Sequence, residues 1–200
     1  MPLRLLAVLA VVVALAAGCS KDKKDGDGDG DRPATSSTSA VGAAPTLQFT
    51  VTETNTNGTK GPDEAQLAAI KRTLDGWLAS AVVAPLHSGR PAPDLAPLFT
   101  AAALERLADP ATRATLVDEG MPPATTAITA EVANVLLSTV AGPDEVLAIV
   151  GARIDVKVRA VGPTLDVDVV HQGEMVLVPE ADGTWRIESF ALRAARDSRA

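Results

Sequence analysis

The chain is poor in the residues that build most disulfide, metal and stacking sites. Its 200 residues include no Tyr, one Cys, two His, two Trp and three Phe. A single Cys has no partner for a disulfide within the chain. One Cys and two His are too few for the usual four-ligand zinc cage unless carboxylates join it. The sequence therefore predicts no disulfide scaffold, no metal site and no cofactor.

Basic charge is also scarce. Eighteen Lys and Arg residues stand against 25 Asp and Glu, which gives a formal net charge of −7 and a pI of about 4.8. Binding to nucleic acid needs Lys and Arg opposite the phosphates, so we expect no nucleic-acid partner. The hydrophobic fraction of 46% is sufficient for a packed core. This length predicts one ordinary domain with additional segments.

The longest apolar run lies close to the N-terminus. Residues 5–17, LLAVLAVVVALAA, follow Arg4 without a charged or polar interruption. As a helix these residues would reach only about 20 Å, which is short of the roughly 30 Å hydrocarbon core of a bilayer. The run is therefore typical of the apolar region of a signal peptide rather than of a membrane span.

The end of this run, Leu15-Ala16-Ala17-Gly18-Cys19, resembles the lipobox of bacterial lipoproteins, although Ala16 stands where that family most often has Leu. The resemblance implies a thioether-linked diacylglycerol on Cys19 and cleavage between Gly18 and Cys19. Two acyl chains hold a protein stably on a membrane. We therefore expect anchoring to the cell membrane on its extracytoplasmic face. The alternative is an ordinary secretory signal in which Cys19 is incidental.

The segment after the lipobox has the composition of a tether. Residues 19–45 are mostly charged residues, Gly, Ser, Thr, Pro and Ala, which predicts a disordered linker. Its DGDGDGD stretch matches the first half of a calcium loop, but Ser36 occupies the position of the closing Glu. A solvated spacer is thus the favoured interpretation. The predicted organisation is a signal peptide over 1–18, this linker, and a single domain over 46–200.

Helical patterns come first in the domain. A short strand over 46–54 precedes a helix over 63–83, whose apolar residues recur at intervals of three and four. Pro85 and the prolines after it predict a break in the helix. Thr100 and Asp109 are typical N-caps of two further short helices.

From residue 124 the pattern changes to the period of two that strands have. Strands are predicted to end at Gly142 and at Gly162, followed by a third strand from residue 165 and a last strand over 184–192. A three-residue loop with Gly183 in the left-handed region would set the register of the last hairpin, with Leu177 opposite Ile187. In the first long strand one face is predicted to hold Ile128, Val132, Leu136 and Val140.

The register of the middle hairpin follows from matching both faces of its strands. Pairing Ala160 with Leu165 places apolar residues opposite one another on the inner face. The same pairing sets His171 opposite Ile154. On the outer face it sets opposite charges against each other, as Arg159 with Asp166 and Lys157 with Asp168.

Helices followed by antiparallel strands predict an α+β fold, with N-terminal helices packed on a curved antiparallel sheet of about four strands. This order over residues 63–192, with its Gly-Thr-Trp-Arg-Ile ending, resembles the nuclear-transport-factor-2-like (ketosteroid-isomerase-like) superfamily. Members of that superfamily in actinobacterial envelopes include lipoproteins. The strand over 46–54 is an addition, and a cystatin-like or other helix-on-sheet fold is the alternative.

The resemblance implies a cup between helices and sheet that binds a small ligand, carries out acid–base chemistry, or is filled. Ketosteroid isomerisation combines an Asp base with a Tyr hydroxyl, and a chain without Tyr cannot use that mechanism. A buried His171 beside an acid would be a candidate general base, whereas a satisfied core His is the simpler interpretation. The candidate pocket residues are His171, Met175, Ile154 and Trp77.

Three functions are consistent with these features. The first is a non-enzymatic envelope lipoprotein that acts as an interaction or accessory module, with an envelope protein as its partner. The second is a carrier of a small apolar ligand or lipid in the cup. The third is an acid–base enzyme that uses His171, although the sequence has no recognisable nucleophile motif, phosphate loop or metal-ligand spacing.

Overall fold

The computed structural model describes residues 46–51, 61–141 and 147–199. The predicted signal peptide and linker, and with them Gly18 and Cys19, lie outside the described residues. The elements in chain order are β1 (Gln48–Val51), α1 (Glu64–Trp77), the π-helical segment η1 (Leu78–Val83), α2 (Ala84–Ser88), the 3-10 turn η2 (Ala96–Leu98), α3 (Ala101–Arg106), α4 (Pro110–Ala114), β2 (Ala127–Ala141), β3 (Leu147–Gly162), β4 (Leu165–Pro179) and β5 (Trp185–Ser198).

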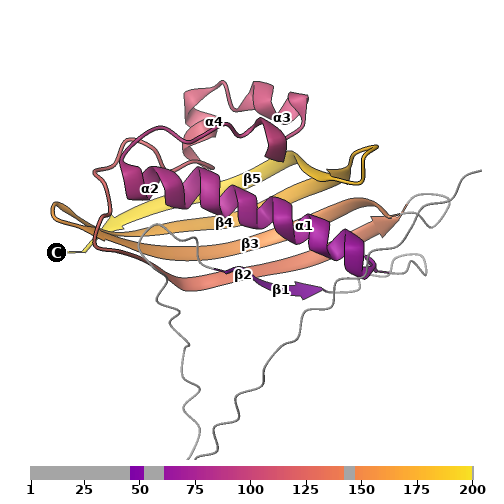
Figure 1. Ribbon diagram of the computed structural model, residues 1–200, viewed down its shortest axis with the longest axis horizontal. Helices are drawn as coiled ribbons and strands as arrows, with labels where there is room; N and C mark the ends of the chain where they lie inside the picture. Colours follow the sequence, from indigo (N-terminus) through magenta and orange to yellow (C-terminus); the bar gives the residue numbers. More distant parts are fainter. Residues whose placement is uncertain (1–45, 52–60, 142–146, 200) are drawn as a thin grey trace, which may run out of the picture. The chain divides into compact units, whose positions relative to one another are not determined.

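The domain has two layers, a helical layer and one sheet, and the predicted α+β fold is confirmed (Figure 1). The sheet has five strands in the order β1-β2-β3-β4-β5, and only β1 runs parallel to its neighbour. The strand predicted over 46–54 thus extends the sheet beyond the four strands expected. In Figure 1, α1 and α2 cross one face of the sheet, while α3 and α4 lie beside them, near β5.

The start of α1 follows from its first residues. Asp63 is the N-cap and accepts a hydrogen bond from the backbone of Gln66 at 2.8 Å, while the Gln66 side chain accepts one from the backbone of Asp63 at 3.0 Å. This capping box satisfies two of the N–H groups that a helix start leaves free. The face toward the sheet is apolar, and Ile70, Leu74 and Trp77 are fully buried.

The predicted break at Pro85 is wrong, because the helical rod continues through η1 and α2 to Ser88. In η1 the chain adopts the wider π-helical winding, in which the Ala84 N–H binds the Ala79 carbonyl. Pro85 has no N–H to offer the Ala81 carbonyl, its partner in an α-helix. That carbonyl instead accepts a hydrogen bond from the Asp118 N–H at 2.9 Å. Tertiary structure thus replaces the bond that Pro85 removes.

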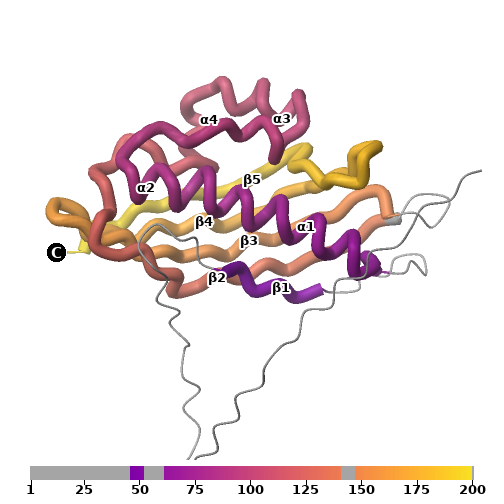
Figure 2. Tube along the Cα trace, in the orientation of Figure 1, coloured from indigo at the N-terminus to yellow at the C-terminus, as the bar shows by residue number. Residues whose placement is uncertain are grey.

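Beyond α4 the chain passes along the end of α2 before it enters β2 (Figure 2). The Ala124 N–H binds the Leu86 carbonyl at 2.7 Å, which fastens this segment to the end of the helical rod. The helix there ends at Gly89, whose φ of 64° is in the left-handed region that suits a helix C-terminus. The strands therefore begin at a position set by the helices.

The prediction that one face of β2 holds Ile128, Val132, Leu136 and Val140 is wrong. A β-bulge places Glu131 between residues that pair with β3, so the alternation of faces shifts by one residue. Ile128 is buried in the core, whereas Leu136 is 40% and Val140 51% exposed on the opposite face. After the bulge the residues that enter the core are Ala133, Val135 and Leu137.

The predicted register of the β3–β4 hairpin is wrong by two residues. Leu165 pairs with Gly162 rather than with Ala160, because the connecting turn is tighter than expected. His171 consequently lies opposite Val156, and Gly173 lies opposite Ile154. Side chains in a strand alternate with a period of two, so a slip of two residues leaves every side chain on its predicted face.

The predicted outer ion pairs form in spite of the changed register. Arg159 contacts Asp166 at 2.8 Å and Lys157 contacts Asp168 at 3.1 Å. Both pairs are diagonal rather than directly opposite, since Arg159 pairs in the ladder with Asp168. Long side chains reach diagonal neighbours easily across an antiparallel sheet. The charge pattern therefore identified the contacts but not the register.

The last hairpin agrees with prediction at its turn and differs at its end. Leu177 pairs with Ile187, and Gly183 has a φ of 81°, as expected. However, β5 continues to Ser198 instead of ending near residue 192. Its added length places Arg196 on the inner face, in register with Val169.

We expect Gly173→Ala to destabilise the domain by roughly 2 kcal/mol or more. Gly173 has a φ of 144°, and a Cβ there would collide with the Ala191 carbonyl of β5. Gly183→Ala is the matched control, because its φ is also positive but no atom lies within 4 Å of the added Cβ. Urea unfolding measures both variants, and equal losses would contradict the steric explanation.

Candidate functional site

The four predicted pocket residues lie on the inner side of the two layers. Trp77 from α1 and His171, Met175 and Ile154 from the sheet are each 1% exposed or less. The rings of Trp77 and His171 meet edge to face, with their centroids 5.7 Å apart. These side chains occupy space that the ligand-carrier hypothesis would leave open.

His171 hydrogen bonds through both of its ring nitrogens. Its Nε2 lies 2.6 Å from Oδ2 of Asp118, and its Nδ1 lies 3.2 Å from the carbonyl oxygen of Thr115. Asp118 also receives a hydrogen bond at 2.9 Å from Nε of Arg196 to Oδ1. The side chains of His171 and Asp118 are fully buried, whereas that of Arg196 is 32% exposed. We call these three residues together with Trp77 the Asp118 cluster.

The hydrogen-bond partners determine where protons lie in the Asp118 cluster. A carbonyl oxygen can only accept, so Nδ1 of His171 must carry a hydrogen that it donates to Thr115. The contact of 2.6 Å between Nε2 and the carboxylate then requires a second proton between those two atoms. Arg196 donates to the other oxygen of Asp118, so both oxygens of this carboxyl group have a hydrogen-bond partner.

The cluster also binds backbone carbonyls from the last residue of α4 to Val117. Backbone carbonyls in a buried segment need hydrogen-bond donors. Nη2 of Arg196 approaches the carbonyls of Ala114 and Val117 at 3.4 and 3.2 Å. Nε1 of Trp77 donates to the carbonyl of Leu116 at 3.2 Å. With the bond from His171 to Thr115, four consecutive carbonyls receive a side-chain donor.

This arrangement connects separate segments of the chain through buried hydrogen bonds. A general base must come within hydrogen-bond distance of the proton that it removes from a substrate. Both ring nitrogens of His171 are already occupied by protein groups, and neither His171 nor Asp118 is exposed. The Asp118 cluster therefore fixes the segment after α4 against β4 and β5.

Sequence reasoning identified His171 and Trp77 but missed Asp118 and Arg196. Asp118 follows a short helix, where a polar residue is expected at the surface. Arg196 lies beyond the predicted end of the last strand. The alternation of Phe190, Leu192 and residue 194 continues to Arg196, and this would have placed a cation on the inner face.

A second, partly buried connection joins α4 to the preceding loop. Nε and Nη2 of Arg113 donate to Glu119 at 3.0 and 2.6 Å, and Glu119 accepts a further bond from the Ala92 N–H at 2.6 Å. The hydrogen bond from Arg113 is the main cause that lowers the pKa of Glu119, and the same bond raises the pKa of Arg113. The pair is therefore ionised at neutral pH.

The outer face of the sheet carries the remaining features of interest. Four charged side chains form a network there, in which Lys157 and Arg199 both contact Glu131 and Asp168 at 2.7 to 3.1 Å. The hydrogen bond from Arg199 is the largest cause that lowers the pKa of Asp168.

A hollow of about 700 Å³ on the sheet is lined largely by polar side chains and also by Ile154 of the predicted pocket set.

The chain matches no protein-family model, no curated protein and no solved structure. Within the described ranges, no group of three or more His, Cys, Asp and Glu side chains is placed to hold a metal ion. No helix in the described part of the chain has both the length and the apolar character needed to cross a membrane.

We expect Asp118→Asn to destabilise the domain by roughly 3–5 kcal/mol, because it removes the buried carboxylate that pairs with Arg196 and hydrogen bonds to His171. Asp166→Asn serves as the control, since Asp166 pairs with Arg159 at the partly exposed outer face and should matter much less. Urea unfolding at neutral pH checks both variants. A loss for Asp118→Asn no larger than that of the control would contradict the role given to the cluster.

The lowered pKa of Glu119 predicts how its contribution depends on pH. A group whose pKa is lower in the folded state contributes stability that is fully present above its unfolded pKa of about 4.3. That contribution is lost as the pH falls through the lower, folded pKa. The difference in unfolding free energy between the wild type and Glu119→Gln should therefore be largest near neutral pH and shrink toward pH of about 3. Urea unfolding across this range would refute the assignment if the difference stays constant.

Proposed function

We propose that the protein is a membrane-anchored lipoprotein of the cell envelope whose domain is a non-enzymatic interaction or accessory module. The complete burial of His171 and Asp118 is the observation that carries the non-enzymatic part. His171 was the candidate general base, and it is fully buried with both ring nitrogens bonded to protein atoms. A cluster in this state supports a structural role better than it supports acid–base catalysis.

The proposal of a membrane anchor rests on the N-terminal sequence. The apolar run over 5–17 ends in the lipobox-like sequence before Cys19. A flexible linker of 26 residues after Cys19 would span about 30 Å, which is enough to hold the domain clear of the lipid headgroups. The domain would thus be tethered to the membrane and remain accessible to other envelope proteins.

We further infer membership of the nuclear-transport-factor-2-like superfamily. A long helix that crosses one face of a sheet, followed by four strands that pair in chain order, is the arrangement which that resemblance implies. We infer that side chains fill the cup between helices and sheet, because Trp77, His171 and Met175 are buried between the layers. A filled cup supports an interaction module over a ligand carrier.

The outer face of the sheet is the surface that we propose for an envelope protein partner. The bulge at Glu131 turns Leu136 and Val140 away from the core, and Val140 pairs across the strands with Ile149. These side chains are 40%, 51% and 39% exposed, respectively. Exposed apolar side chains gathered on one face are typical of protein interaction sites. Their neighbours Arg153 and Glu174 would add charge selectivity.

The anchor is tested by the substitution Cys19→Ala. We expect the wild type in the membrane fraction and the variant to be released from it, because the variant has no thiol to receive the diacylglycerol. Ser20→Ala is the matched control and should remain in the membrane. Immunoblots of fractionated cells give the result, and a Cys19→Ala protein that stays membrane-bound would refute the anchor.

The interaction surface is tested by placing a photo-crosslinking amino acid at Val140 in living cells. We expect a discrete crosslinked protein from this position, since its side chain is the most exposed of the three. The control position is Ala68, which is exposed on α1 in the helical layer. The proposal fails if Val140 gives no adduct or if both positions give the same adducts.

A further inference from the structure

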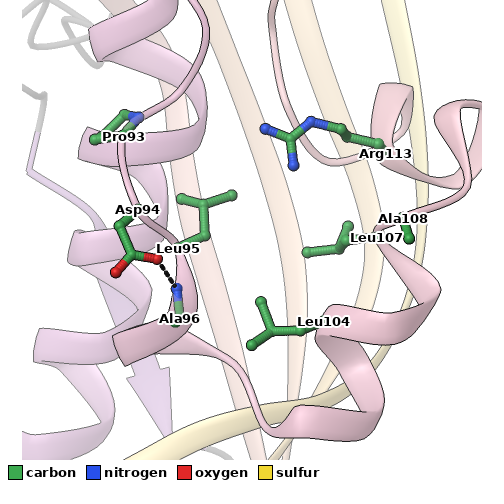
Figure 3. A pocket seen from close by; sticks show the side chains of 8 residues that line it. All are labelled: Pro93, Asp94, Leu95, Ala96, Leu104, Leu107, Ala108 and Arg113. Carbon is green, nitrogen blue, oxygen red and sulfur yellow. Dashed lines mark hydrogen bonds between the residues drawn. The ribbon is translucent and has the colours of Figure 1, made fainter.

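A hollow beside α3 has the features of a small binding site, and it lies apart from the cup and from the outer face of the sheet. Its volume is about 330 Å³, close to the lower end of the range of about 300–1,000 Å³ that ligand pockets occupy. One wall is the segment of residues 93–96, and the other is formed by Leu104 of α3, by residues 107–108 and by Arg113 of α4 (Figure 3).

The hollow has an apolar lining that is anchored in the core. Leu95 and Leu107 are only 5% and 4% exposed, and Leu104 is half-buried. In Figure 3 the side chains of these three leucines lie around the same space. Asp94, on the same wall, uses Oδ1 to accept a hydrogen bond from the Ala96 N–H at 2.9 Å. Six of the eight lining residues are apolar, and Leu104 is the leucine with the most surface to offer a short hydrocarbon body.

Arg113 supplies a cation to this apolar space. Its guanidinium group extends over the hollow in Figure 3, and its side chain is 33% exposed. Glu119 engages Nε and Nη2 of Arg113, whereas Nη1 has no hydrogen-bond partner among the described residues. Because Glu119 is also bonded to Ala92, the guanidinium is held in place relative to the facing wall.

A second cation lies on the far side of Arg113. Arg113 also lines an adjacent depression of about 190 Å³, together with Arg196 and Glu119. Arg196 is held there by Asp118, and its Nη1 likewise has no hydrogen-bond partner among the described residues. Arg113 therefore lies between the hollow and an adjacent depression that holds a second guanidinium group. Guanidinium groups bind carboxylates and phosphates through short, charge-assisted hydrogen bonds.

We propose that this hollow binds a small amphipathic anion, with its apolar body against the three leucines and its carboxylate or phosphate group on Arg113. The Arg113–Glu119 pair then has a second consequence, since it holds the guanidinium group beside the site. This inference does not depend on the proposed interaction role, because it uses neither the membrane anchor nor the outer face of the sheet.

The test is a titration of the isotope-labelled full chain, followed by NMR of its backbone amides. The probes are octanoate, octyl phosphate and the cationic control octylammonium. We expect saturable shifts at Leu95, Leu104, Leu107 and Arg113 with the two anions, and much weaker shifts with octylammonium. Equal responses to octanoate and octylammonium, or no saturable response, would overturn the proposal.

Substitutions test the cationic part and the apolar part of the site one at a time. Arg113→Gln should weaken octanoate binding roughly tenfold or more, since a hydrogen bond to a charged group is lost. Arg90→Gln is the matched control on a nearby exposed residue that does not line the hollow. Leu104→Ala keeps the Arg113–Glu119 pair and should weaken both anionic probes several-fold through lost apolar contact. Unchanged affinity in Leu104→Ala would refute the assignment even if Arg113→Gln proves unstable.

A final titration, with lipid vesicles, distinguishes a membrane lipid from a free amphiphile as the anion. Vesicles of phosphatidylglycerol would perturb the same amides if the site takes the end of a membrane lipid, whereas vesicles of phosphatidylcholine would not. A response to octanoate alone would indicate a free amphiphile. Either result supports the shared chemistry of an anionic head on an apolar body, and a response confined to amides elsewhere would contradict it.

Discussion

The buried carboxylate of Asp118 is the point on which the helical layer and the sheet depend. A charge removed completely from water is tolerated only when every side of it is paired. Here the pairing comes from two strands, because His171 of β4 and Arg196 of β5 bind the carboxylate oxygens. The backbone N–H of Asp118 also donates to the Ala81 carbonyl of η1. The position of the segment after α4, between the helical rod and the sheet, follows from these bonds.

Two irregular features of the helical rod, Pro85 and the π-helical segment η1, favour the contact between Ala81 and Asp118. Pro85 removes one backbone donor, and the π-helical winding of η1 accompanies it. The Ala81 carbonyl is thereby free to accept from Asp118, and Trp77, one turn earlier, reaches Leu116. Local departures from α-helical geometry are often found where a helix has a specific partner. In this domain that partner is the segment that leads from α4 to β2.

Much of the fold could be predicted because each strand alternates with a strict period. The inner positions of β3 and β4 were assigned correctly even though their register was wrong by two residues. The same logic failed in β2, where a bulge at Glu131 shifts the faces by one residue. Nothing in the local pattern marks that bulge. Of the candidate site, the sequence indicated His171 and Trp77, but the acid beside them was missed because it lies 53 residues away in the chain.

The sequence by itself determined the α+β order of elements, the capped starts of the helices, and the inward faces of β3 and β4. These properties depend on residues a few positions apart, so they can be read from local spacing. Tertiary structure alone decided the bulge of β2, the helical path through Pro85 and the partners of Asp118. These depend on hydrogen bonds between distant segments, and only the folded chain brings such groups to the same place.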